Sequence, residues 1–124
     1  MVFILLFSKI EKLYTNHSIH GVWVSKTKSG SHKYIFNKDG TCMFTLKDNN
    51  RIFEGNFKID FSKVPISLSI KNISDIDHPL HTIVEFIDQD SIRMAMMSSK
   101  WRLRPISFDS KTLINLKRIN LVDY

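Results

Sequence analysis

The chain has 124 residues, of which 43% are hydrophobic and 24% are charged, and its formal net charge is +6. This length and composition describe one globular domain and exclude a disordered or collagen-like chain. The single cysteine excludes an internal disulfide bond, and the longest apolar run, residues 2–7, is far shorter than the roughly 20 residues of a membrane-spanning helix. The sequence therefore predicts a soluble protein without a transmembrane segment.

Residues 1–18 are predicted to form an amphipathic helix outside the main domain. The apolar side chains that follow the spacing of one helix face are Phe3, Leu6, Phe7, Ile10, Leu13 and Tyr14. This face packs over the domain or, alternatively, binds a membrane surface or a second copy. The segment has no basic start and no small-residue cleavage site, so we expect a cytoplasmic protein. Secretion stays open if the segment is the remnant of a clipped signal.

From residue 22 to residue 119 the chain alternates apolar and polar side chains over eight short stretches separated by turn residues. The predicted strands are residues 22–26, 33–37, 41–47, 51–60, 66–71, 82–87, 91–97 and 112–119. Asp39-Gly40 is the strongest hairpin signal. Eight strands joined mostly by tight turns predict an all-β, antiparallel up-and-down barrel over residues 19–124, because closure pairs the two edges that an open sheet exposes.

Alternation along the predicted strands also predicts which side chains point into the barrel. They are Tyr34, Phe36, Phe44, Phe57, Leu68, Phe86, Met94 and Met96. An eight-stranded barrel is either filled by such side chains or holds one small ligand. The bulk of these residues favours a packed core, and any pocket left among them is small and apolar. Cys42 lies within an apolar strand, where a buried, unreactive thiol is expected.

Several short motifs resemble, in order and spacing, a group of bacterial lipocalin-like domains. They are Gly21-x-Trp23, Asp39-Gly40, Gly55-x-Phe57-x-Ile59-Asp60, Pro65-Ile66-x-Leu68, the hairpin of residues 85–94, Arg104-Pro105-x-x-Phe108 and Leu116-Lys117-Arg118. The resemblance covers residues 19–119 and leaves the predicted N-terminal helix outside. It implies a lipocalin-like barrel, the fold of small-molecule carriers.

The resemblance also implies a structural role for two residues. In lipocalin-like barrels a tryptophan of the first strand plugs one end, and an arginine of the last strand lies across it. In this sequence these residues are Trp23 and Arg118. A guanidinium group over an indole contributes roughly 0.5 to 2 kcal/mol, and such a pair ties the first strand to the last.

No pattern in the sequence predicts an enzyme or a cofactor. The five histidines show no spacing that brings a nucleophile, a base and a carboxylate together. One cluster has ligand types that suit a divalent metal, namely Asp75, Asp77, His78 and His81. Because the cluster lies in a polar stretch without a cysteine, we expect a solvated loop rather than a metal site.

Charge is distributed unevenly along the chain. Residues 1–47 hold seven Lys and Arg against two acids, residues 48–90 hold four against eight, and residues 91–124 hold seven against two. Closure of a barrel places the two basic thirds side by side, and the candidate basic surface consists of Lys26, Lys28, Lys33, Lys100, Arg102 and Arg104. This surface favours an acidic protein partner. Nucleic acid is less favoured, because the aromatic residues alternate as core residues rather than forming a stacking platform.

Two functions follow from the sequence. The first is a non-enzymatic lipocalin-like binding module that holds a small hydrophobic ligand in the barrel. The alternative is a protein–protein interaction domain, for example an inhibitor, that acts through its charged outer surface. An internal cavity favours the first function, and a filled barrel with a continuous basic or apolar surface patch favours the second.

Overall fold

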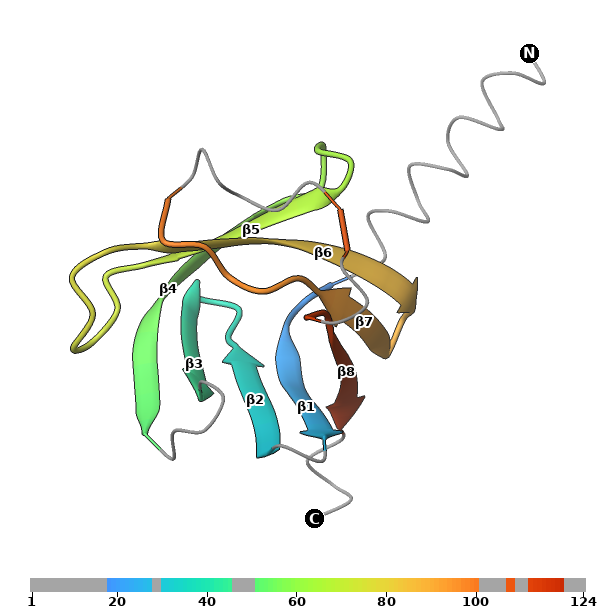
Figure 1. The fold of residues 1–124 in the computed structure, drawn as a ribbon, viewed down its shortest axis with the longest axis horizontal. Coiled ribbons are helices and arrows are strands. Elements are labelled where there is room, and N and C mark those ends of the chain that lie inside the picture. The colour runs from blue at the N-terminus through green and yellow to red at the C-terminus, as the bar shows by residue number, and fades with distance from the viewer. Residues whose placement is uncertain (1–17, 28–29, 46–50, 101–106, 109–111, 120–124) are drawn as a thin grey trace.

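The computed structural model describes residues 18–27, 30–45, 51–100, 107–108 and 112–119. These residues form an all-β fold in which each strand pairs with the next one along the chain (Figure 1). The strands are β1 (Gly21–Thr27), β2 (Gly30–Phe36), β3 (Thr41–Thr45), β4 (Ile52–Asp60), β5 (Ile66–Lys71), β6 (Leu80–Asp88), β7 (Ser91–Met94) and β8 (Ile114–Ile119). The helix predicted over residues 1–18 lies, apart from Ser18, outside the described residues.

The barrel is closed by antiparallel pairing of the first strand with the last. Trp23 of β1 lies opposite Arg118 of β8 in the register of this pair. The strand order around the barrel is the order along the chain, so the predicted closed antiparallel barrel is confirmed. Among the described residues no helix is long and apolar enough to cross a membrane.

The turn between β2 and β3 follows the Asp-Gly signal in the sequence. Gly40 has a φ of 90°, a conformation that residues with a Cβ rarely adopt. The Asp39 carboxylate accepts hydrogen bonds from the Thr41 backbone N–H (3.0 Å) and hydroxyl (2.6 Å). These bonds, the hydroxyl bond first, hold the pKa of Asp39 below its usual value. Local chemistry therefore fixes this hairpin and the register that follows it.

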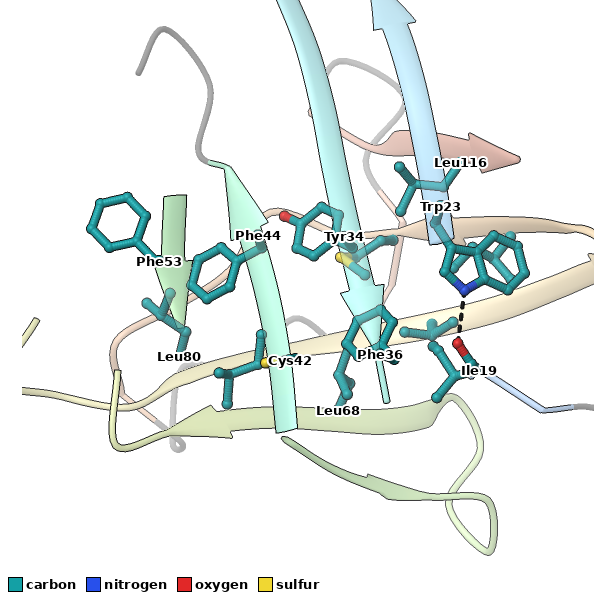
Figure 2. Packing of buried hydrophobic residues seen from close by; sticks show 14 of the residues in the cluster. Ile19, Trp23, Tyr34, Phe36, Cys42, Phe44, Phe53, Leu68, Leu80 and Leu116 are labelled. Carbon is teal, nitrogen blue, oxygen red and sulfur yellow. Dashed lines mark hydrogen bonds between the residues drawn. The ribbon is translucent and has the colours of Figure 1, made fainter. Parts of the chain in front are cut away.

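The core fills the barrel with side chains from every strand (Figure 2). Four rings from β4, β3 and β2 contact one another in sequence, with centroid separations of 5.6 Å between Phe53 and Phe44, 5.8 Å between Phe44 and Tyr34, and 6.0 Å between Tyr34 and Phe36 of the same strand. Cys42 is buried beside them, as expected, and burial raises the pKa of its thiol to about 11. Burial also raises the pKa of Tyr34. The centre of the barrel is apolar and largely aromatic.

The prediction that Met96 points into the barrel is wrong. Strand β7 ends at Met94, and the side chain of Met96 is 62% exposed. Beyond Met94 the chain leaves the ladder with β8, because Ser98 exchanges two backbone hydrogen bonds with His81 at the start of β6 (2.7 and 2.8 Å). The alternation of a strand therefore stops two residues before Met96.

Candidate functional site

One end of the barrel is tied together by Trp23 and Arg118. The indole is fully buried and donates a hydrogen bond from Nε1 to the backbone oxygen of Ile19 (2.7 Å; Figure 2). The guanidinium carbon of Arg118 lies 4.6 Å from the centroid of the Trp23 ring. The two residues therefore have the relative placement that the resemblance implies, a cation over the plug of the barrel.

Arg118 also holds the chain that enters β1. Its Nη1 donates to the backbone oxygen of His20 (2.7 Å), its Nη2 donates to that of Ser18, and its Nε lies 3.3 Å from the carboxylate of Asp90. Gly21 begins β1 with a φ of 128°, a value that favours glycine. The last strand thus fixes both the start of the first strand and the turn between β6 and β7.

Seven of the eight residues predicted to point into the barrel lie in the core cluster or pack against it. The fully buried ones are Tyr34, Phe36, Phe44, Leu68 and Met94. Phe57 and Phe86 are partly buried and pack against this cluster, with the Phe57 ring 4.9 Å from that of Phe36. Because these side chains pack against one another inside the barrel, their positions form a packed core.

A pocket of about 240 Å³ lies instead at the rim, on the end of the barrel that carries Trp23. It is formed by the β4–β5 turn, drawn as the light-green loop in Figure 1, and by the facing end of β6. Its lining residues are Phe61, Lys63, Val64, Pro65, Ile66, Val84, Glu85 and Phe86. We call this site the rim pocket.

The walls of the rim pocket are mostly apolar and are attached to the core. The rings of Phe61 and Phe86 stack with centroids 6.1 Å apart, and Phe86 meets the edge of Trp23 at 6.4 Å. Ile66 and Val84 are cross-strand partners on β5 and β6. The side chain of Val64 stands at the lip and is 92% exposed. The pocket is therefore open to solvent on one side and backed by the packed barrel on the other.

Sequence reasoning placed only Phe86 among the candidate ligand-binding residues of this pocket. Phe61 and Val64 lie in a turn, where no strand alternation indicates which way a side chain points. The signal available in the sequence was the concentration of apolar residues in that turn, from Phe61 to Pro65, beside a strand end. An apolar side chain as exposed as Val64 has no role in the core.

The histidine and aspartate cluster is dispersed in the structure. Asp75 pairs with Arg51 at 2.5 Å, His78 is exposed, and His81 lies on β6, where its Nδ1 is 2.9 Å from the Ser69 hydroxyl. Within the described part of the chain, no group of three His, Cys, Asp or Glu side chains is placed to hold a metal ion.

The candidate basic surface falls largely outside the described side chains. Lys33 and Lys100 are exposed, whereas the structure does not describe the side chains of Lys26, Lys28, Arg102 and Arg104. Closure does bring the two basic thirds of the chain together. Lys33 of β2 and Lys117 of β8 are both the cross-strand partners of Val24 on β1, so they lie in one row.

Comparison with protein-family models, with curated proteins and with solved structures finds no match to this chain.

Proposed function

We propose that this protein is a non-enzymatic binding module with a lipocalin-like barrel, and that it holds a small hydrophobic ligand in the rim pocket rather than inside the barrel. The observation that carries the proposal is the rim pocket itself, an apolar space of about 240 Å³ that opens to solvent beside a filled core. The placement of Arg118 over Trp23 supports the lipocalin-like architecture.

The size of the rim pocket limits the ligand. An apolar cavity of about 150 Å³ holds a benzene molecule, so about 240 Å³ holds a benzene ring with a side chain of about three or four atoms. Burial of each methylene contributes about 0.8 kcal/mol, from which the cost of immobilising the ligand is subtracted. We therefore expect a Kd on the order of 1 mM for a neutral probe of this size.

A neutral probe, 3-phenyl-1-propanol, tests the proposal. Titration followed by backbone amide chemical shifts is expected to give saturable changes around residues 61–66 and 84–86. Phe61→Asp, which places a charge on the apolar wall, is expected to abolish saturation. Ile52→Asp is the matched control, because Ile52 is 62% exposed at the far end of β4. Equal binding by the wild-type protein and Phe61→Asp would contradict the proposal, as would shifts that never saturate.

One observation favours the alternative, a protein-binding function. Lys33 and Lys117 share a row across the β2–β1–β8 surface, and both side chains are exposed. Clustered cations steer acidic proteins toward such a surface. Under this alternative, replacing both lysines with Gln abolishes capture of an acidic partner and leaves binding of 3-phenyl-1-propanol unchanged.

A further inference from the structure

The rim pocket has two charged side chains in an otherwise apolar lining, Lys63 and Glu85. They carry opposite charges. Whichever of the two is not already paired within the protein is available to pair with a charged ligand.

The charge of Glu85 is balanced within the protein. Its Oε1 accepts a hydrogen bond from Nη2 of Arg93 at 2.7 Å, across the β6–β7 pair. The guanidinium of Arg93 is itself held over the ring of Phe108, 5.8 Å from the centroid. A cationic ligand at the pocket therefore competes with a cation that is already in place.

The charge of Lys63 has no such partner among the described residues. The ion pairs in that part of the chain join Arg51 to Asp75, Arg93 to Glu85 and Arg118 to Asp90. The charge of Lys63 acts on the carboxylate of Asp60, but the two side chains do not form an ion pair.

Asp60 is engaged by its own turn. One of its carboxylate oxygens accepts hydrogen bonds from the hydroxyl and from the backbone N–H of Ser62. These bonds hold the pKa of Asp60 below its usual value, and the charges of Lys63 and Lys58 act in the same direction. Two lysines therefore act on one carboxylate, and of the two it is Lys63 that lines the pocket.

We propose that the rim pocket selects small carboxylates whose compact apolar body packs against the wall formed by Phe61 and Phe86 and whose carboxylate pairs with the Lys63 ammonium group. This inference rests on the proposed function, since it assigns a ligand class to the same pocket. The stacked rings of Phe61 and Phe86 form a wall against which a flat ring packs in an offset arrangement.

The expected preference is modest because Lys63 is exposed. Pairs of exposed charges contribute about 0.2–1 kcal/mol, which corresponds to an increase in affinity of up to about fivefold. Such a preference decreases with added salt, because the screening length falls from about 10 Å at 0.1 M to about 3 Å at 1 M.

Three probes of the same shape separate charge from apolar contact, namely 3-phenylpropanoate, 3-phenyl-1-propanol and 3-phenylpropylammonium. Each is titrated at pH 7 into the full chain, with Kd taken from amide chemical shifts at low and high salt. Lys63→Gln removes the proposed partner of the carboxylate. Lys38→Gln is the matched control, because Lys38 is an exposed lysine in the β2–β3 turn at the same end of the barrel.

The wild-type protein and Lys38→Gln are expected to bind the carboxylate about two to five times more tightly than the alcohol, with the ammonium compound weakest. Lys63→Gln is expected to bind the carboxylate and the alcohol equally. If the alcohol binds and the carboxylate is no tighter, or the ammonium compound is tightest, the inference is overturned while the proposed function stands. If the alcohol does not bind, the proposed function itself fails.

Discussion

The barrel interior and the rim pocket are built from the same kinds of side chain but differ in what faces them. In the interior, rings such as Phe44 and Tyr34 lie 5.8 Å apart, and strands on all sides supply further side chains. At the rim, Phe61 and Phe86 form a single wall, and about 240 Å³ in front of it stays open. Aromatic residues are therefore enclosed where strands converge, whereas at the rim a turn places Phe61 against Phe86 of β6 and the two rings border an open pocket.

Truncation of a ring in the interior is expected to have the largest effect on stability. Phe44→Ala removes a ring that is 1% exposed, and the loss of burial together with the cavity left behind is expected to lower the free energy of unfolding by about 3–5 kcal/mol. Urea denaturation measures this loss. Binding of 3-phenyl-1-propanol to the folded variant should be unchanged. A loss below about 1 kcal/mol would show that the interior is not tightly packed.

The reactivity of the Cys42 thiol tests whether the interior is closed to solvent. The pKa of Cys42 is raised from 9.0 to about 11, so the thiolate at pH 8 is about 100-fold less populated than in an unfolded chain. The reaction with a disulfide reagent is expected to be at least about 100-fold slower in the native protein than in urea. Equal rates would place Cys42 on the surface.

Arg118 tests how the end of the barrel is held. Arg118→Lys keeps the charge but loses the planar fork that reaches the backbone oxygens of His20 and Ser18, at an expected cost of about 1–2 kcal/mol in the free energy of unfolding. Arg51→Lys is the control, since the ion pair of Arg51 with Asp75 is exposed, contributes at most about 1 kcal/mol and can be retained in part by the lysine. Equal effects in the two variants would argue against the role given to Arg118.

Phe61→Ala truncates a ring at the rim, as Phe44→Ala does in the interior, and it is expected to affect stability least. It removes one partner of the stack with Phe86, so the free energy of unfolding should fall by only about 1 kcal/mol. The Kd for 3-phenyl-1-propanol should rise by about two- to tenfold, because the wall of the pocket is lost. Urea denaturation and the amide titration give the two numbers. Unchanged affinity would remove Phe61 from the site.

The sequence predicted the fold well because period-two alternation determines both a strand and its inner face. Tyr34, Phe36 and Phe44 were placed inside the barrel on this basis, and they are buried there. Closure followed from the count of strands, and with it the adjacency of the two basic thirds of the chain. Strand ends were less accurate: β2 begins at Gly30, three residues earlier than predicted, because the β1–β2 hairpin continues to the pair Thr27 and Gly30.

The rim pocket and the position of Met96 could not be predicted from alternation. Met96 and the turn residues of the pocket, from Phe61 to Pro65, lie beyond strand ends, where tertiary contacts decide the path of the chain. The bridge between His81 and Ser98 directs the chain after β7, and the β4–β5 turn places Phe61 beside Phe86. Neither contact is encoded by a local pattern, since the two partners are 17 and 25 positions apart along the chain.

Methyl chemical shifts during titration with 3-phenylpropanoate distinguish binding at the rim from binding inside the barrel, because they report both places in one spectrum. If the ligand binds in the rim pocket, saturable changes are expected at the methyl groups of Val64, Ile66 and Val84, which line the pocket. No change is expected at the methyl groups of Leu68 and Leu116, which are buried in the core. Saturable changes at Leu68 and Leu116, with none at Val64, would place the ligand inside the barrel and contradict binding in the rim pocket.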